Sequence, residues 1–198
     1  NYKRSFGGYG NSCNRWAYAR QFDIYNDKVY IADTYNHRIK VLNLDGSCVW
    51  NNGARFHYPH SIAVGSSYVY VGHNNSYISH YTTNGVQQTG YYNAGSNLSY
   101  SWGMSLNSSG NKLAIGDYSK TYYPPEAQNL QSFYGSIIKI NIKNKEHTLL
   151  SKGLRNPQGL YYDSINNIIL ITDHGPNGGD EINIQNLDEE NFINFGWP

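Results

Sequence analysis

The chain has 198 residues, of which 39% are hydrophobic, so it is long enough for one globular domain and too short for two. Its 15 Lys and Arg against 14 Asp and Glu give a net charge of +1, which excludes the basic field of a nucleic-acid binder. No apolar run approaches the ~20 residues that span a bilayer, so no membrane insertion is expected. The chain starts without Met or a signal-peptide pattern, which we interpret as processing or a fragment.

The two cysteines, Cys13 and Cys48, are not in a CxxC arrangement and have no zinc-site spacing. They could form one disulfide or remain two buried thiols, and the sequence leaves both alternatives open. Only 15% of the residues are charged, and the polar character comes from Asn, Ser, Gly and 20 Tyr. This surface composition is expected of an exported protein, so we predict an extracellular, periplasmic or surface-exposed location.

Short alternating segments bounded by Gly, Asn and Ser turns recur along the chain and predict strands. The first unit has segments 21–24, 29–33, 38–42 and 47–50, and the second has 61–64, 69–73, 77–81 and 86–89. The third unit has 103–106, 113–117, 137–142 and 147–150, and the fourth has 159–162, 170–173 and 181–184. The second segments of successive units end 40, 44 and 56 positions apart. The chain therefore contains an internal repeat of a four-stranded unit.

This repeat predicts an all-β fold, a β-propeller of four-stranded antiparallel blades with about four blades present. The expected blades are approximately 11–51, 52–90, 91–152 and 153–198, within one domain, 1–198. The segment 118–134 is expected to be an insertion in the third blade that loops over one face. A β-sandwich whose strands are similar by accident is the alternative.

The first half of the chain resembles the NHL repeat family, over residues of about 6–90. Residues 31–41 read IADTYNHRIKV, close to the family's V-A-D-T-x-N-H-R-I-x-V core, and 58–85 are a degenerate version with His73 where the Asp is expected. We interpret His37 and Arg38 as fold residues, because Asp33 at the strand end can accept hydrogen bonds from backbone amides or the Arg. NHL propellers are mostly interaction platforms, and the absence of a basic stripe argues against RNA here.

The second half, residues of about 99–198, resembles the soluble aldose/glucose dehydrogenases, which carry pyrroloquinoline quinone (PQQ) and calcium on a six-bladed propeller. The resemblance lies in GLRNPQGL at 153–160, DHGPNGGDEIN at 173–183 and NFGWP at 194–198. It implies that Arg155 clamps a cofactor carboxylate, because a guanidinium binds carboxylates bidentately. Asn156 and Gln158 would hydrogen-bond the rim of the quinone.

The same resemblance implies that main-chain carbonyls of Gly175 and Pro176 hold the active-site calcium, since this hard ion prefers oxygen ligands. Asp180 and Glu181 correspond to residues associated with a second, structural calcium in some members. A purely structural alternative is that Arg155 pairs with Asp180 or Glu181 and locks blades together without any cofactor.

The family's catalytic base is a His, and Tyr100 stands at that position here. A Tyr is a poor base near neutral pH, because its reference pKa is about 10. His60 is a second catalytic candidate, since it lies in register with Gln158 and could face the central channel. Whether the chain is an enzyme therefore stays open.

Four blades are also fewer than a six-bladed ring needs. We expect a partial propeller, completed by further blades or by other chains, over a four-bladed ring closed by residues 2–6. The sequence thus predicts a sugar dehydrogenase-like quinoprotein with intact or impaired catalysis, acting on a small sugar. The alternative is a non-catalytic, exported NHL-type propeller that binds a surface glycan or a protein.

Overall fold

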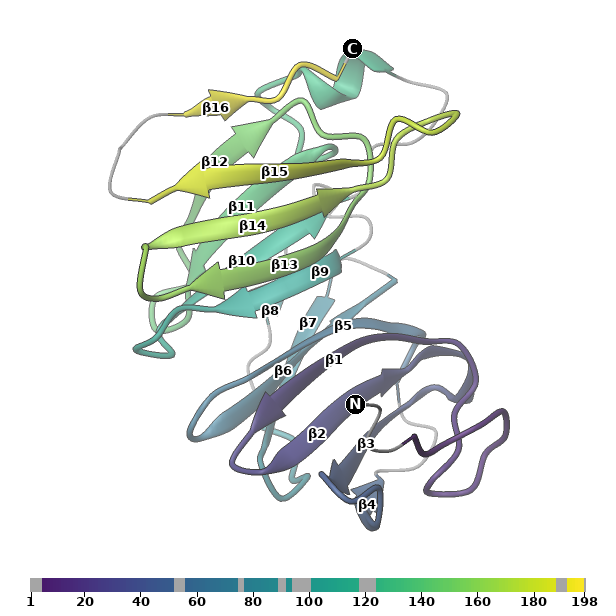
Figure 1. The fold of residues 1–198 in the computed structure, drawn as a ribbon. Helices are drawn as coiled ribbons and strands as arrows, with labels where there is room; N and C mark the ends of the chain where they lie inside the picture. Colours follow the sequence, from purple (N-terminus) through teal and green to yellow (C-terminus); the bar gives the residue numbers. More distant parts are fainter. Residues whose placement is uncertain are drawn as a thin grey trace.

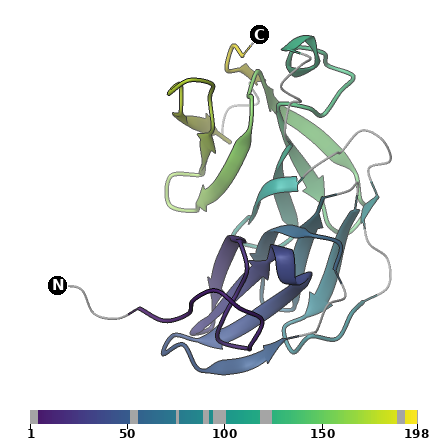
Figure 2. The ribbon, with the colours of Figure 1, turned by 90° about the vertical axis from the view of Figure 1, so that its right-hand side faces the viewer.

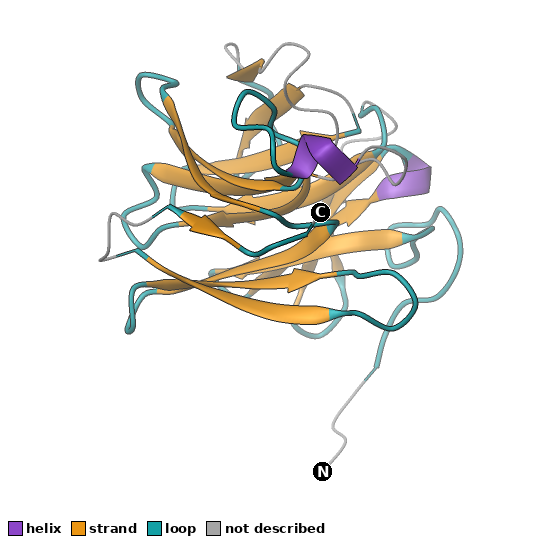
Figure 3. Ribbon diagram, turned by 90° about the horizontal axis from the view of Figure 1, so that it is seen from above, coloured by secondary structure: helices purple, strands orange, loops and turns teal. Residues whose placement is uncertain are grey.

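The computed structural model describes residues 5–51, 56–74, 77–88, 92–93, 101–117, 124–187 and 192–197. Strands dominate, and the described helices are two short 3-10 turns, η1 (Thr34–Asn36) and η3 (Pro124–Ala127) (Figure 3). Within these residues no helix is long and apolar enough to cross a membrane.

The strands form four separate sheets. In each sheet the strands are given in order from the innermost to the outermost. The first sheet comprises β1 (Ala19–Tyr25), β2 (Lys28–Asp33), β3 (Arg38–Asn43) and β4 (Cys48–Asn51). The second comprises β5 (Pro59–Val64), β6 (Tyr68–His73), β7 (Tyr77–Thr82) and β8 (Tyr92–Asn93). The third comprises β9 (Ser101–Leu106), β10 (Lys112–Asp117), β11 (Ser136–Asn141), β12 (His147–Lys152) and β16 (Ile193–Asn194). The fourth comprises β13 (Pro157–Asp163), β14 (Ile168–Asp173) and β15 (Glu181–Asn186).

The local sequence explains the hairpins within each sheet. Tyr25 pairs with Lys28, which leaves Asn26 and Asp27 as a two-residue turn with φ of 48° and 58°. Asn and Asp tolerate this left-handed conformation, which hairpin turns of this kind require. The buried faces are rich in Val, Ile and Tyr, which favour strands. The predicted turn and the predicted second strands are therefore confirmed.

The sheets are arranged as blades around an open arc (Figures 1 and 2). The innermost strands β1, β5, β9 and β13 contact one another in that order, whereas β1 and β13 make no comparable contact among the described strands. In Figure 2 the first sheet (purple) and the fourth (olive and green) lie on one side, with the second and third opposite. The β-propeller class is confirmed, and the β-sandwich and the four-bladed ring are wrong for this arrangement.

A separate hydrophobic core fills each of the three junctions between neighbouring sheets. Ile39 and Ile62 belong to the first core, Met104 and Ile138 to the second, and Ile171 to the third, all nearly inaccessible to solvent. Burying apolar surface at each junction stabilises the pairing of consecutive blades. The arc is thus held by contacts between sequence neighbours.

Polar side chains also join the innermost strands across these junctions. Gln21 of β1 donates from Nε2 to the Met104 carbonyl (2.8 Å) and accepts at Oε1 from the Ile62 amide (3.1 Å). The Asp23 carboxylate accepts the Val64 amide at 2.8 Å. Such bonds satisfy backbone groups that the innermost strands leave unpaired on their inner edge.

The ends of the chain differ from the expected blade boundaries. Short β16 pairs in parallel with β12, so residues 193–194 extend the third sheet and not the fourth. Phe6 packs edge-to-face on Trp16 at 6.5 Å and lies against Gly46, so it belongs to the first sheet. Among residues 2–6, only 5 and 6 lie within the described part. The outer strand of the second sheet is β8, whereas the predicted strand 86–89 gives an isolated bridge between Tyr81 and Gln87.

Two further sequence expectations concern covalent and loop structure. Cys13 and Cys48 form a disulfide, with Cα atoms 5.8 Å apart, so the alternative of two thiols is wrong. The described part of the expected insertion, 124–134, is anchored by buried Lys152, which donates to the carbonyls of Glu126, Ser132 and Tyr134 at 3.1, 2.7 and 2.9 Å. These bonds hold the loop against the end of β12.

Close approach of the third and fourth sheets requires glycine in β10. A Cβ on Gly116 would lie 2.8 Å from the Pro157 carbonyl oxygen, and backbone cannot move aside easily. We therefore expect Gly116→Ala to lower the free energy of unfolding by about 1–3 kcal/mol in urea denaturation. Gly65→Ala is the control, because its Cβ would lie 3.3 Å from the flexible end of Leu106 and 3.9 Å, an ordinary contact distance, from the Tyr68 carbonyl oxygen. Equal stability of Gly116→Ala and wild type would contradict the close approach.

Candidate functional site

Each sheet has a bulge near the start of its innermost strand. Ala19, Pro59, Ser101 and Pro157 pair with the last residues of the second strands, Asp33, His73, Asp117 and Asp173, and the register then shifts. The residues that follow these pairs and lie in the bulges are Arg20, His60, Trp102 and Gln158. Because a bulge takes a residue out of the ladder and redirects its side chain, the four sheets present these residues on the same face of the propeller. In the first sheet the bulge also includes Gln21.

Three of these four residues contact one another. The His60 ring stacks on Trp102 with 4.7 Å between centroids, and the Arg20 guanidinium lies over the same indole at 4.3 Å. Burial, together with the smaller effects of the nearby Arg20 and His73, lowers the pKa of His60 to about 4. His60 is therefore neutral at neutral pH and packed under the indole.

A strand-end carboxylate organises the fourth blade. Asp173 accepts the Arg155 amide at Oδ2 (2.9 Å) and the Asn156 amide at Oδ1 (2.6 Å). Burial raises the pKa of Asp173, the two amide bonds oppose that shift, and Glu181 adds to it. The bonds fix the segment that leads into β13 against the end of β14.

Arg155 also links the segment before β13 to the loop after β14. Its Nη1 donates to the His174 carbonyl at 2.8 Å, and its guanidinium carbon lies 5.8 Å from the centre of the Trp197 ring. Asp180 contacts His174 Nδ1 at 2.9 Å and accepts the Gly175 amide at 3.1 Å. Within the described residues Arg155 makes no ion pair with Asp180 or Glu181, so the purely structural pairing expected as an alternative is wrong.

Two buried polar atoms at this junction have no partner within the described part of the chain. They are Nε of Arg155, a donor, and Oδ1 of Asn156, an acceptor. Buried polar groups are normally hydrogen-bonded, so an unpaired donor and an unpaired acceptor on consecutive residues mark this place as a candidate binding site. A molecule with carboxylate and N–H or hydroxyl groups fits these two atoms.

A hollow of about 460 Å³ adjoins the junction and is lined by Gln158, Thr172, Asp173, His174, Asp180, Glu181 and Ile182. Thus Gln158, Asp180 and Glu181 of the predicted site share one hollow, next to Arg155 and Asn156. The loop around Gly175 is tight, because a Cβ there would lie 1.9 Å from the Gly179 carbonyl oxygen. The Pro176 carbonyl accepts the Gly179 amide at 3.1 Å and can accept one further partner.

Side chains alone do not form a metal centre here. No three His, Cys, Asp or Glu among the described residues are placed to share an ion. A cation in this loop would need main-chain oxygens in addition to Asp180 and Glu181, which is the kind of ligand set that calcium accepts.

The remaining predicted positions are Tyr100 and His60. Tyr100, the expected place of the catalytic base, lies outside the described residues. His60 belongs to the cluster with Trp102 and Arg20. The sequence analysis missed those two residues, although the register argument that placed His60 beside Gln158 also applies to them.

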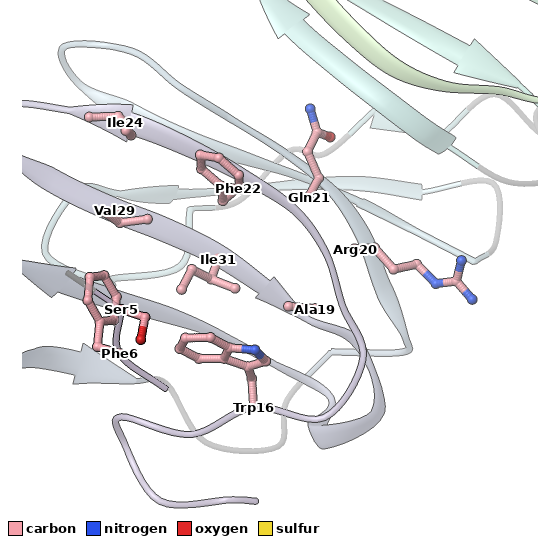
Figure 4. A pocket seen from close by; sticks show the side chains of 10 residues that line it. All are labelled: Ser5, Phe6, Trp16, Ala19, Arg20, Gln21, Phe22, Ile24, Val29 and Ile31. Atoms are coloured by element: carbon pink, nitrogen blue, oxygen red, sulfur yellow. The ribbon is translucent and has the colours of Figure 1, made fainter. Parts of the chain in front are cut away.

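A second hollow, of about 450 Å³, lies on the uncovered face of the first sheet (Figure 4). Its lining is apolar and includes Trp16, Phe22 and Ile24, the latter two 63% and 54% exposed. At the other end of the arc, Ile182 and Ile184 are likewise exposed on the fourth sheet. Both end faces therefore have the composition of blade junctions.

Comparison with protein families gives one match, to the model described as Glucose / Sorbosone dehydrogenase, over residues 92–198. Among curated proteins, the aldose sugar dehydrogenase YliI of Escherichia coli is 29% identical over 99 residues, which are 43% of this chain. The chain spans only 25% of that relative's length.

Solved structures support the fold. The holo PQQ domain of pyranose dehydrogenase from Coprinopsis cinerea matches with a TM-score of 0.69 at 12% identity, covering 92% of this chain and 54% of that one. A putative glucose dehydrogenase of Thermus thermophilus matches with a TM-score of 0.66 at 20% identity, covering 89% and 63%. At these identities the likeness is one of fold.

Two buried histidines, His60 and His73, should make the folded protein less stable in acid. Burial lowers the pKa of His60 and of His73 to about 4, from 6.5, and their side chains are only 5% and 7% exposed. The unfolded chain binds more protons than the folded chain between these values, so stability is full above pH 6.5 and falls towards pH 4. We expect a loss of about 2 kcal/mol per histidine between pH 7 and pH 5 in urea denaturation.

His73→Gln separates this cause from general acid effects. Gln can still bond the Ser79 hydroxyl, which His73 Nε2 contacts at 2.7 Å, but it does not titrate. The variant should lose less stability between pH 7 and pH 5 than wild type, whereas the exposed control His147→Gln should behave like wild type. Identical slopes for all three proteins would contradict the assignment.

Proposed function

The chain belongs to the glucose/sorbosone dehydrogenase family, and on that premise we propose that it carries the cofactor-binding part of a sugar dehydrogenase that uses PQQ and calcium. One observation carries the proposal: Asp173 and Arg155 join segments 155–158 and 173–181 into one polar surface with an unpaired buried donor and acceptor. Both segments lie inside the region that matches the family.

The residues of this surface fit the proposed group. Arg155 would bind a cofactor carboxylate through its remaining donors, and Asn156 and Gln158 would hydrogen-bond the rim of the ring system. Carbonyls of Gly175 and Pro176 would hold calcium, with Asp180 and Glu181 contributing negative charge or a second ion site. When bound, PQQ supplies the hydride acceptor and calcium the Lewis acid that polarises it.

The sugar hydroxyl must also lose a proton, and the described residues favour a positioning role for His60 in that step. Its burial under Trp102 and its pKa of about 4 make it a weak base that the substrate cannot reach directly. We propose that His60 supports Trp102 and Arg20 at the rim, and that the proton acceptor lies elsewhere. Turnover of an aldose with a dye acceptor tests whether the chain is catalytic on its own.

Two further proposals concern the setting of the chain. The disulfide between Cys13 and Cys48 supports an exported or surface-exposed location, because disulfides persist in oxidising compartments. The apolar end faces of the arc support further blades, from this polypeptide or another chain, as partners of the first and fourth sheets.

Thermal melting tests the cofactor site directly. With PQQ and calcium at about 100 times their dissociation constant, we expect stabilisation by about 2.7 kcal/mol and a rise in Tm of roughly 5–10 °C. Gln158→Ala should reduce the rise without changing the Tm of the apoprotein, because its side chain is exposed. Gln87→Ala, an exposed glutamine beyond β7 in the second sheet, is the control.

The pattern of shifts separates the alternatives. A rise with calcium alone would indicate only a structural ion near Asp180 and Glu181. No rise under any condition would overturn the cofactor proposal and favour a non-catalytic propeller that binds carbohydrate or protein.

A further inference from the structure

Three tyrosines from separate segments, two exposed and one half-buried, form a continuous cluster, which we call the tyrosine platform. Its members are Tyr18, Tyr35 and Tyr58, packed edge-to-face with centroid distances of 4.6 Å between the first two and 5.9 Å between the last two. His37 and His57 flank Tyr58 at 4.2 and 5.4 Å. Tyr18 is 66% exposed and Tyr35 is 49% exposed, so the platform presents aromatic surface to solvent.

The platform lies on the same face of the propeller as the polar surface around Arg155. Tyr18 and Tyr58 immediately precede the innermost strands β1 and β5, as Asn156 precedes β13, and Tyr35 follows the second strand, as Gly175 does. Arg20 interacts electrostatically with Tyr35 and also lies over Trp102. The rim therefore runs from the platform through Arg20 and Trp102 towards the fourth blade.

The backbone beneath the platform is strained and firmly held. Tyr18, His37 and Tyr58 have φ of 51°, 53° and 47°, a left-handed conformation that bulky residues seldom adopt. Hydrogen bonds fix it: the Tyr35 amide donates to the Ala17 carbonyl (3.1 Å), and the Asn74 amide donates to the Tyr58 carbonyl (3.2 Å). Strain that surrounding structure maintains is typical of binding sites, and here it orients solvent-exposed rings.

The chemistry of the platform selects its ligand. Exposed tyrosine rings offer apolar faces with a hydroxyl at one edge, and polar groups surround them: Asn74 Oδ1 accepts from His57 Nδ1 (2.9 Å), and Asn36 Nδ2 donates to Asp33. The Arg20 guanidinium, which interacts with Tyr35, is already stacked over Trp102. A neutral ligand with an apolar C–H face and a hydroxyl-bearing edge matches this surface, and these are the properties of a pyranose ring.

We propose that Tyr18, Tyr35 and Tyr58 bind successive pyranose rings of a neutral oligosaccharide at the rim of the propeller. Three rings together cover more than the footprint of one sugar, so the site favours a chain over a monosaccharide. The inference goes beyond the proposed function, because the platform needs no cofactor and lies outside the matched region 92–198. Blades one and two would then bind one end of a glycan.

Titration of the cofactor-free chain with maltohexaose and cellohexaose, followed by tyrosine fluorescence, tests the proposal. We expect saturable binding of at least one of the two, weakened roughly three- to tenfold by Tyr35→Ala. Tyr18→Gly should weaken binding comparably while keeping the fold, because glycine adopts a φ of 51° without strain. Tyr161→Ala, which removes a 64% exposed tyrosine from the fourth sheet, is the matched control.

Several results would overturn the proposal. These are no binding of either hexasaccharide, binding of D-glucose as tight as that of the hexasaccharides, or equal weakening by Tyr161→Ala and Tyr35→Ala. Because no PQQ is present, a failure of the cofactor melting experiment leaves this titration unaffected. A protein ligand would show itself by Tyr35→Ala reducing protein capture with no response to either sugar, which also contradicts the proposal.

Discussion

A buried carboxylate at the end of the second strand fixes the segment that leads into the innermost strand. In the first blade Asp33 accepts the Ala17 amide at 2.7 Å, and Arg38 Nε neutralises it at 2.8 Å. In the fourth blade Asp173 accepts two amides, from Arg155 and Asn156. Hydrogen bonds to a buried charge are strong, and leaving the charge unpaired is costly. The position of the strand end therefore determines the position of the segment that leads into the innermost strand.

The carboxylate has different partners in the first and fourth blades. In the first blade the counter-ions are side chains of the same sheet, Arg38 and buried Lys40, whose Nζ lies 3.4 Å from Asp33 Oδ2. In the fourth blade no described side chain makes an ion pair with Asp173, and Arg155 instead reaches the His174 carbonyl. That difference leaves polar groups unsatisfied around the fourth blade, and it is why the cofactor proposal rests there and not on the first blade.

The sequence predicted the second strands well, because alternating Val and Ile residues and a terminal Asp or His mark them locally. It failed for β8 and β16, which are two residues long and exist only through pairing, β8 with the preceding strand β7 and β16 with the more distant β12. Arg20 and Trp102 were missed because a bulge is a property of strand register, which composition does not reveal. The tyrosine platform was missed because its three members come from segments that meet only when two blades pack. The structure brings the motifs at 155–158 and 173–181 together around Asp173, and the cofactor that they would hold is a proposal.

Calorimetric titration of PQQ, in the presence of calcium, into Asp173→Asn and Asp33→Asn tests the central claim, that Asp173 builds the cofactor surface. Both changes remove one strand-end carboxylate, and an amide has one acceptor oxygen where the carboxylate has two. At a temperature where both variants are folded, affinity should fall roughly tenfold in Asp173→Asn and stay at the wild-type value in Asp33→Asn. Unchanged affinity in Asp173→Asn, or an equal loss in both, would contradict the account.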